Sequence, residues 1–320
     1  MSRPLDRILA LEAVRVTEAA AIKASRLVGR GDERAADQAA VEGMREAFNA
    51  LPIDGTVVIG EGERDEAPMW FVGEKVGAGG IKVDIALDPL EGTTLTARAL
   101  PNALAVMAMA EAGTLLNAPD VYMDKIAIGP GFAEGIIDLD ADPADNIIAL
   151  AKAKGVSPSA IKALVLDRPR HEKIIASIRS TGASVQLITD GDVAGVIATT
   201  DPGATGVDIY IGQGGAPEGV LAAAALRCVG GQLQTRLVFR NDDERRRAER
   251  MGVRDFNRKY MLKDLASGDV VFAATGVTNG TMLEGVVVDG PYITTHSIVM
   301  RSATQTVRWI KMRHPNLYGS

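Results

Sequence analysis

The sequence predicts an α/β protein with a mostly parallel or mixed sheet. In the second half, short apolar runs of strand length alternate with helical segments, as in repeated strand–helix units. In the first half, two apolar runs rich in branched residues end in acids, with glycines close by. The expected strands are residues 55–59, 81–87, 103–109, 125–131, 163–166, 184–188, 206–211 and 270–280, with closing strands within 286–309. The expected helices are residues 5–27, 35–49, 147–154, 171–180, 193–198, 220–229 and 240–250.

Periodicity and glycines set the limits of these elements. The first helix has apolar residues at helical spacing and ends at the glycines of residues 29–31. Residues 117–123 are expected to form a loop that presents Tyr122. The weakest pattern lies near the middle of the chain. We therefore expect a single catalytic unit in two halves, residues 1–150 and 151–320.

Composition excludes several classes of function. The chain has 320 residues, of which 47% are apolar and 24% charged, as in an ordinary globular protein. A net charge of −6 and an aromatic content of 4% argue against a general nucleic-acid binder. The lone Cys228 permits no internal disulfide. No apolar run reaches the length of a membrane span, and the N-terminus lacks the apolar core of a signal peptide. We expect a cytoplasmic protein that binds neither nucleic acid nor membrane.

The stretch Asp88-Pro89-Leu90-Glu91-Gly92-Thr93-Thr94 is the motif around which the site is expected to form. The preceding strand should stop at Asp88, because Pro89 has no N–H for the sheet. Gly92 permits a sharp turn, and a following threonine can cap the next segment. Two acids three residues apart can hold one hard cation such as Mg²⁺ or Mn²⁺, while the N–H groups after the turn face a phosphate. The alternative is a capped turn with solvated acids.

Other acids of the first half are weaker candidates on their own. Glu61 lies between two glycines directly after the strand of residues 55–59, in the usual setting of an oxygen ligand. If this strand neighbours the one that ends at Asp88, the two acids suggest a shared cation site. The further acids of residues 63–66 make a solvated loop the alternative. Asp37, in the first turn of the second helix, would ordinarily be only a partner of the helix dipole.

Three successive strand ends of the second half carry groups suited to a phosphorylated sugar. They are Asp167-Arg168-Pro169-Arg170, Asp190-Gly191-Asp192 and the glycine-rich loop 212–219, which contains Glu218. The basic pair suits a phosphate, and the acids suit sugar hydroxyl groups. Each stretch alone could be a surface turn. Their common position at strand ends favours a binding site, because ligands of such sheets bind beyond the carboxyl ends of the strands.

Taken together, Gly60-Glu61-Gly62-Glu63, Asp88-Pro89-Leu90-Glu91-Gly92-Thr93 and Gly214-Gly215-Ala216-Pro217-Glu218-Gly219 resemble the class II fructose-1,6-bisphosphatases of the lithium-sensitive phosphatase superfamily. The likeness extends from about Leu11 to Trp309. It implies a layered α/β/α/β/α fold and hydrolysis of the 1-phosphate of fructose 1,6-bisphosphate, giving fructose 6-phosphate and phosphate in gluconeogenesis or related metabolism. It also implies inhibition by Li⁺ and assembly into a homo-oligomer.

The resemblance implies a role for each matching position. Two or more Mg²⁺ or Mn²⁺ ions would be held by Asp37, Glu61, Asp88, Glu91 and Glu218. Substrate contacts would come from Glu91, Gly92, Thr93, Tyr122, Arg168, Pro169, Arg170, Asp190, Gly191, Asp192 and Gly215. Thr93, with Asp37 or Glu61, would orient the attacking water and take its proton.

One departure from the family pattern is visible, and other functions stay open. Glu33-Arg34 stands where the family often has Lys-Asn, which puts in doubt a basic side chain at position 33. Sedoheptulose 1,7-bisphosphate is an alternative or additional substrate. An inositol phosphate fits less well, because it leaves Arg168 and Arg170 without a second phosphate. A non-catalytic sugar-phosphate-binding regulator would not need Thr93.

Overall fold

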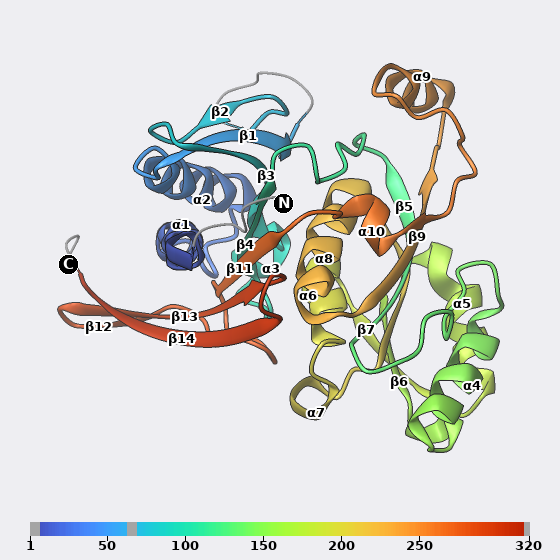
Figure 1. The fold of residues 1–320 in the computed structure, drawn as a ribbon. Coiled ribbons are helices and arrows are strands. Elements are labelled where there is room, and N and C mark those ends of the chain that lie inside the picture. Colours follow the sequence, from blue (N-terminus) through green and yellow to red (C-terminus); the bar gives the residue numbers. More distant parts are fainter. Residues whose placement is uncertain (1–6, 63–68, 317–320) are drawn as a thin grey trace. The chain divides into compact units, whose positions relative to one another are not determined.

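The computed structural model describes residues 7–62 and 69–316, and the chain divides into two compact units. The first unit contains Met1–Leu115 and Gly268–Ser320, and the second contains Leu116–Ser267 (Figure 1). These limits differ from halves divided at residue 150, because the C-terminal strands pair with the sheet of the first unit. That the chain acts as one catalytic unit stays a prediction.

The first unit is built on an eight-stranded sheet in the order β12-β13-β11-β4-β3-β1-β2, with β14 paired to β13. β1 and β3 run parallel, whereas β3 and β4 run antiparallel. The strands are β1 (Ile53–Ile59), β2 (Lys75–Val76), β3 (Ile81–Glu91), β4 (Leu104–Glu111), β11 (Val270–Gly276), β12 (Val287–Asp289), β13 (Tyr292–Arg301) and β14 (Thr306–Pro315).

Two long helices cover one face of this sheet (Figure 1). α1 (Arg7–Ser25) packs on β11, β13 and β4, while α2 (Glu33–Phe48) packs on α1 and β3. The core between them takes alternate residues of the strands, such as Ile85 and Met107, together with Val16 and Met44 of the helices. This packing fixes α2 against β3, the strand that contains Asp88. A short helix, α3 (Thr93–Ala97), follows β3 after Gly92.

The second unit has a mixed six-stranded sheet in the order β10-β9-β5-β8-β6-β7. Its strands are β5 (Tyr122–Ile128), β6 (Lys162–Leu166), β7 (Ser184–Ile188), β8 (Ile209–Gly215), β9 (Gln232–Val238) and β10 (Tyr260–Met261). Its helices are α4 (Pro143–Lys154), α5 (Glu172–Ser180), α6 (Asp192–Ala198), α7 (Pro202–Thr205), α8 (Ala216–Val229), α9 (Asp242–Arg250) and α10 (Leu262–Leu265), with 3-10 turns at Pro158–Ala160 and Pro169–His171.

Helices lie on both faces of the second sheet, with α6 and α8 on one face and α4 and α5 on the other (Figure 1). Ile126 and Ile128 of β5 pack with Leu150 of α4 and Ile178 of α5. Because side chains alternate along a strand, Lys125 points to the opposite face, towards α6 and α8. None of the helices in the described residues is both long and apolar enough to span a membrane.

The predicted α/β class and its layering of helices on sheets are confirmed, but several strand limits differ. β3 continues through Pro89 to Glu91 instead of stopping at Asp88, because a β-bulge in its pairing with β4 accommodates the missing N–H. β8 extends to Gly215, where a loop was expected. Tyr122 is the first residue of β5 and not part of a loop. β9 has no counterpart among the predicted strands.

Candidate active site

Three acids of the first unit lie together where β1 and β3 approach their ends. The parallel register pairs Ile59 with Ala86, so Glu61 comes alongside Asp88 two residues farther on. Asp37 comes from the second turn of α2, not from its first turn as predicted, because the helix already begins after Asp32. Its side chain is hydrogen-bonded to that of Glu61.

The electrostatics of this cluster favour a cation. Burial, followed by the charges of Asp37 and Asp88, raises the pKa of Glu61 to about 8. Burial also raises the pKa of Asp37. A divalent ion between these carboxylates would offset their mutual repulsion, and their all-oxygen donor set fits a hard ion.

Across residues 7–62 and 69–316, no three His, Cys, Asp or Glu side chains form a metal-binding group. The neighbouring acids Glu63, Asp65 and Glu66, predicted to form a solvated loop, lie outside the described residues.

Trp70 supports Glu61 and was not singled out from the sequence. Its backbone N–H donates a 2.9 Å hydrogen bond to Oε2 of Glu61. The indole is buried, contacts Phe48 edge to face at 5.5 Å, and has the Arg45 guanidinium 4.0 Å from its ring centroid. A tryptophan shortly after the acid-rich sequence of residues 61–66 was the available signal.

β3 leads into α3 through a single residue, Gly92. Near the end of β3, at its bulge, the N–H of Leu90 donates to Oδ1 of Asp88 at 3.0 Å. Gly92 adopts a left-handed conformation with φ of 92° and is itself the N-terminal cap of α3. The expected cap by a threonine side chain is therefore wrong, since no side chain caps this helix. Glu91 is buried and Thr93 is half-buried.

In the second unit, two of the predicted strand ends converge on Tyr122. The pairing of β5 with β8 places Tyr122 opposite Gly215. The guanidinium carbon of Arg170 lies 4.9 Å from the centroid of the Tyr122 ring, and its Nη2 donates to the Gln213 carbonyl at 2.8 Å. Arg168, on the same turn, donates to the Asp167 carbonyl at 3.0 Å.

The predicted stretch Asp190-Gly191-Asp192 contributes a buried ion pair inside the second unit. Asp192, the first residue of α6, forms an ion pair with Lys125 of β5 in which the side chains are 7% and 0% exposed. Its carboxylate occupies the space that a Cβ at position 214 would need, which explains Gly214. Gly191 has φ of 88°, so a glycine suits this turn. Lys125 was not predicted, although a lone lysine in an apolar strand is a signal for a buried charge pair.

Comparison with known proteins identifies the chain's relatives. Residues 7–314 match a family described as bacterial fructose-1,6-bisphosphatase, glpX-encoded. This chain belongs to that family. It is 46% identical over 325 residues to fructose-1,6-bisphosphatase 1 class 2 of Escherichia coli strain K12, which covers 97% of this chain and 96% of that protein. Fructose-1,6-bisphosphatases class 2 of Escherichia coli O6:H1 and of Shigella flexneri match with the same identity and coverage.

Within this member of the bacterial fructose-1,6-bisphosphatase family, Glu218 belongs to the second unit and the other four predicted metal ligands to the first. Glu218 lies in the first turn of α8 and folds back on Gly215, where a Cβ would overlap its carboxylate. That it joins Asp88 and Glu91 at a metal ion stays a prediction.

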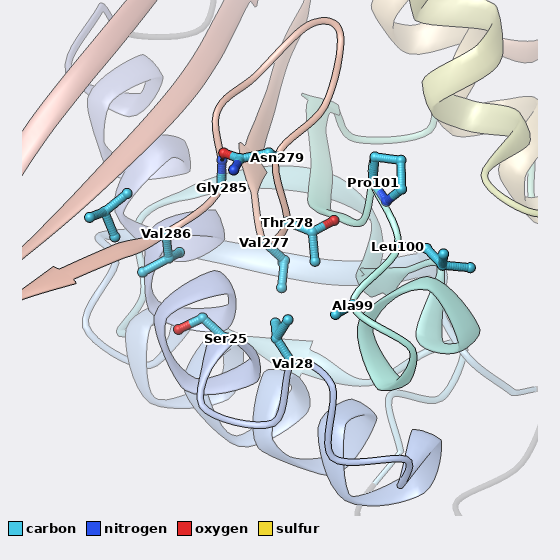
Figure 2. A pocket seen from close by; sticks show the side chains of 11 residues that line it. Ser25, Val28, Ala99, Leu100, Pro101, Val277, Thr278, Asn279, Gly285 and Val286 are labelled. Carbon is cyan, nitrogen blue, oxygen red and sulfur yellow. Dashed lines mark hydrogen bonds between the residues drawn. The ribbon is translucent and has the colours of Figure 1, made fainter.

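A separate cavity of about 430 Å³ lies in the first unit of this family member (Figure 2). It lies between the end of α1, the segment after α3 and the turn that follows β11. Its walls are formed by Ser25, Val28, Ala99, Leu100, Pro101, Val277, Thr278, Asn279, Gly285, Val286 and Val287. None of these was predicted as a metal or substrate residue, and none is charged.

Proposed function

We propose that this chain is a metal-dependent fructose-1,6-bisphosphatase that releases the 1-phosphate of fructose 1,6-bisphosphate and leaves fructose 6-phosphate. The observation that supports this most is the match to class 2 fructose-1,6-bisphosphatases over 97% of the chain. The meeting of Asp37, Glu61 and Asp88 supports it independently, because crowded buried carboxylates call for positive charge.

In the proposed mechanism, residues of the first unit act on the phosphate that is cleaved, and residues of the second unit bind the rest of the substrate. Two or more divalent ions, Mg²⁺ or Mn²⁺, would be held by Asp37, Glu61, Asp88, Glu91 and Glu218, and would supply positive charge to the phosphoryl group and the leaving oxygen. Asp37 or Glu61 accepts the proton of the attacking water, which the hydroxyl of Thr93 orients. Backbone N–H groups of Gly92 and Thr93 stabilise the equatorial phosphate oxygens.

The rest of the substrate is held by the second unit. Arg168 and Arg170 bind the phosphate that is not cleaved, so that binding energy from this remote group orients the reacting one. Asp190, Gly191 and Gly215 contact the sugar. Asp192 contributes through the shape of its turn, since its carboxylate is already paired with Lys125.

A second candidate substrate fits the same chemistry. The paired arginines favour a bisphosphate over a monophosphate such as an inositol phosphate. They do not distinguish a six-carbon from a seven-carbon sugar bisphosphate. Sedoheptulose 1,7-bisphosphate is therefore the main alternative. Membership of the lithium-sensitive superfamily, cytoplasmic location and assembly into a homo-oligomer stay predictions.

The test is phosphate release from fructose 1,6-bisphosphate, sedoheptulose 1,7-bisphosphate and inositol 1-phosphate, with Mg²⁺, Mn²⁺ or a chelator. We expect turnover of the first substrate only with metal. Thr93→Ala and Glu61→Ala are each expected to reduce kcat at least about 100-fold with the fold unchanged by circular dichroism. Glu42→Ala, an exposed acid on the same helix as Asp37, is the control. Metal-independent turnover, or near-normal rates in the two site variants, would contradict the proposal.

A further inference from the structure

Arg240 lies just beyond the end of β9, next to the candidate phosphate subsite of the second unit. The pairing of β5 with β9 places Val238 opposite Tyr122, so the chain two residues later extends past the tyrosine. The guanidinium carbon of Arg240 lies 4.7 Å from the centroid of the Tyr122 ring. No sequence motif pointed to this residue, which stands in a stretch of alternating charges.

Two cations therefore share one aromatic ring. The guanidinium carbons of Arg170 and Arg240 lie 4.9 and 4.7 Å from the Tyr122 centroid, so they cannot be more than 9.6 Å apart. One phosphate dianion between two such groups can accept hydrogen bonds from both, since guanidinium groups suit phosphate geometry. The ring attracts both cations and places them before a ligand arrives.

Arg240 is also held from behind by a buried acid. Glu244 of α9, with a side chain only 3% exposed, accepts hydrogen bonds of 2.7 Å from the Arg240 backbone N–H and from its Nε. Nη2 of Arg240 lies 2.5 Å from the same carboxylate. Among the described residues, Nη1 of Arg240 has no hydrogen-bond partner, and the side chain is 56% exposed. One edge of the guanidinium is thus anchored while the other faces solvent.

Two arginines of α9, Arg245 and Arg246, provide a comparison for Arg240. Arg245 and Arg246 pair with Asp242 and Asp243 one turn away, and all four side chains are more than half exposed. These are ordinary surface pairs on a helix. Arg240 differs in two respects, because its acid is buried and its guanidinium stacks on a residue of the candidate site.

We propose that Arg240 is a further ligand of the uncleaved phosphate, alongside Arg168 and Arg170, and that Glu244 positions it. Arg240 thereby contributes to the preference for a bisphosphate over a monophosphate. This inference rests on the proposed function, because it assigns a residue to that substrate.

The test compares Arg240→Gln with the wild type on fructose 1,6-bisphosphate and on fructose 1-phosphate, which lacks the second phosphate. The ratio of the two kcat/KM values should fall about 10- to 100-fold, through a higher KM for the bisphosphate. Glu244→Gln should lower the ratio less, and Arg240→Gln/Glu244→Gln should match Arg240→Gln alone. Arg240→Lys should restore part of the ratio. The control Arg246→Gln should leave it unchanged.

Binding of fructose 6-phosphate, measured by calorimetry, makes the result independent of turnover. Arg240→Gln should weaken this binding by a similar factor, with thermal unfolding confirming an intact fold. A ratio and an affinity both within twofold of the wild type would overturn the role of Arg240, and so would an equal loss on both substrates. A wild type that binds fructose 6-phosphate through Arg240 but releases no phosphate would instead refute the proposed function and leave this assignment standing.

Discussion

In the first unit the candidate site consists of carboxyl groups that burial and mutual repulsion drive towards protonation, whereas in the second it consists of guanidinium groups stacked on a tyrosine. Both regions are proposed to bind a phosphate of the same substrate. The phosphate that is cleaved needs positive charge that can also act on the leaving oxygen, as a divalent ion does. The phosphate that is only held needs fixed hydrogen-bond donors, which arginine provides.

The two regions also differ in how their buried charge is balanced. In the part of the chain that the structure describes, no cationic side chain is among the causes of the raised pKa values of Glu61 and Asp37. In the second unit the buried carboxylate of Asp192 is matched by Lys125, and that of Glu244 by Arg240. Within the described residues, the buried carboxylates of the first region thus repel one another without a matching cation, while those of the second are each paired with a basic side chain.

The largest expected effect follows from this imbalance, in the metal-free protein. Glu61 has a folded pKa of about 8 against an ordinary value of 4.5, so the native state binds more protons than the unfolded state between these values. Stability is therefore greatest below pH 4.5 with respect to this group and is lost as pH rises to about 8. The loss is expected to be on the order of 5 kcal/mol, from a pKa difference of about 3.5. Denaturant unfolding at a series of pH values in chelator measures it.

The matched variant is Glu61→Gln, which cannot lose a proton and should show a flatter stability profile over the same range. In the wild type, saturating Mg²⁺ or Mn²⁺ should stabilise more strongly as pH rises, because the ions bind deprotonated carboxylates. A wild-type profile as flat as that of Glu61→Gln would show that the carboxylates of the first unit do not repel one another as inferred.

The second largest expected effect concerns Lys125, which balances the buried charge of Asp192 in the second unit. Lys125→Met leaves Asp192 buried without a cation and should cost about 3 kcal/mol of unfolding free energy. Adding Asp192→Asn should recover part of that loss, because both charges are then removed. Addition of Mg²⁺ should recover none of it, in contrast to the first unit.

Lys154→Met is the control for this measurement. Lys154 pairs with Asp208, whose side chain is 7% exposed like that of Asp192, but Lys154 itself is 28% exposed. Asp208 also accepts a hydrogen bond of 2.8 Å from the Lys162 N–H, which compensates its charge. The expected cost is about 1 kcal/mol. Equal costs for the two lysine variants would mean that the depth of burial does not set the difference.

The acids of the first unit were predictable because their positions follow from local pattern. A parallel pair of strands carries its C-terminal ends to the same edge, so Glu61 and Asp88 could be placed together from sequence alone. Asp37 could not, because a helix position reveals nothing of which strand end it packs beside. The resemblance of the whole sequence to a known family is what assigned Asp37 to the metal site.

The arginine subsite was only half predictable, for a related reason. Arg168 and Arg170 follow an apolar run and stand out as a strand end. Arg240 follows β9, whose polar residues hide its strand pattern, and it reaches Tyr122 only through long-range antiparallel pairing. Lys125 likewise pairs with Asp192, which lies 67 residues later in the sequence. Such contacts depend on topology, which local periodicity does not encode.

The smallest expected effect concerns the ring between the two arginines. Tyr122→Leu removes the aromatic face on which Arg170 and Arg240 rest, and the KM for fructose 1,6-bisphosphate should rise about 5- to 10-fold. Tyr122→Phe keeps the face and should change KM less than twofold. Tyr292→Leu removes an equivalent ring beneath Arg313, outside the candidate site, and serves as the control. If Tyr122→Phe lost as much as Tyr122→Leu, the hydroxyl would be the functional group, and the ring would not be what organises the guanidinium groups. If KM rises in Tyr122→Leu but not in Tyr122→Phe, the aromatic face of Tyr122 positions the arginines of the second unit before the phosphate binds. The first unit, by contrast, is proposed to bind its phosphate through divalent ions taken from solution.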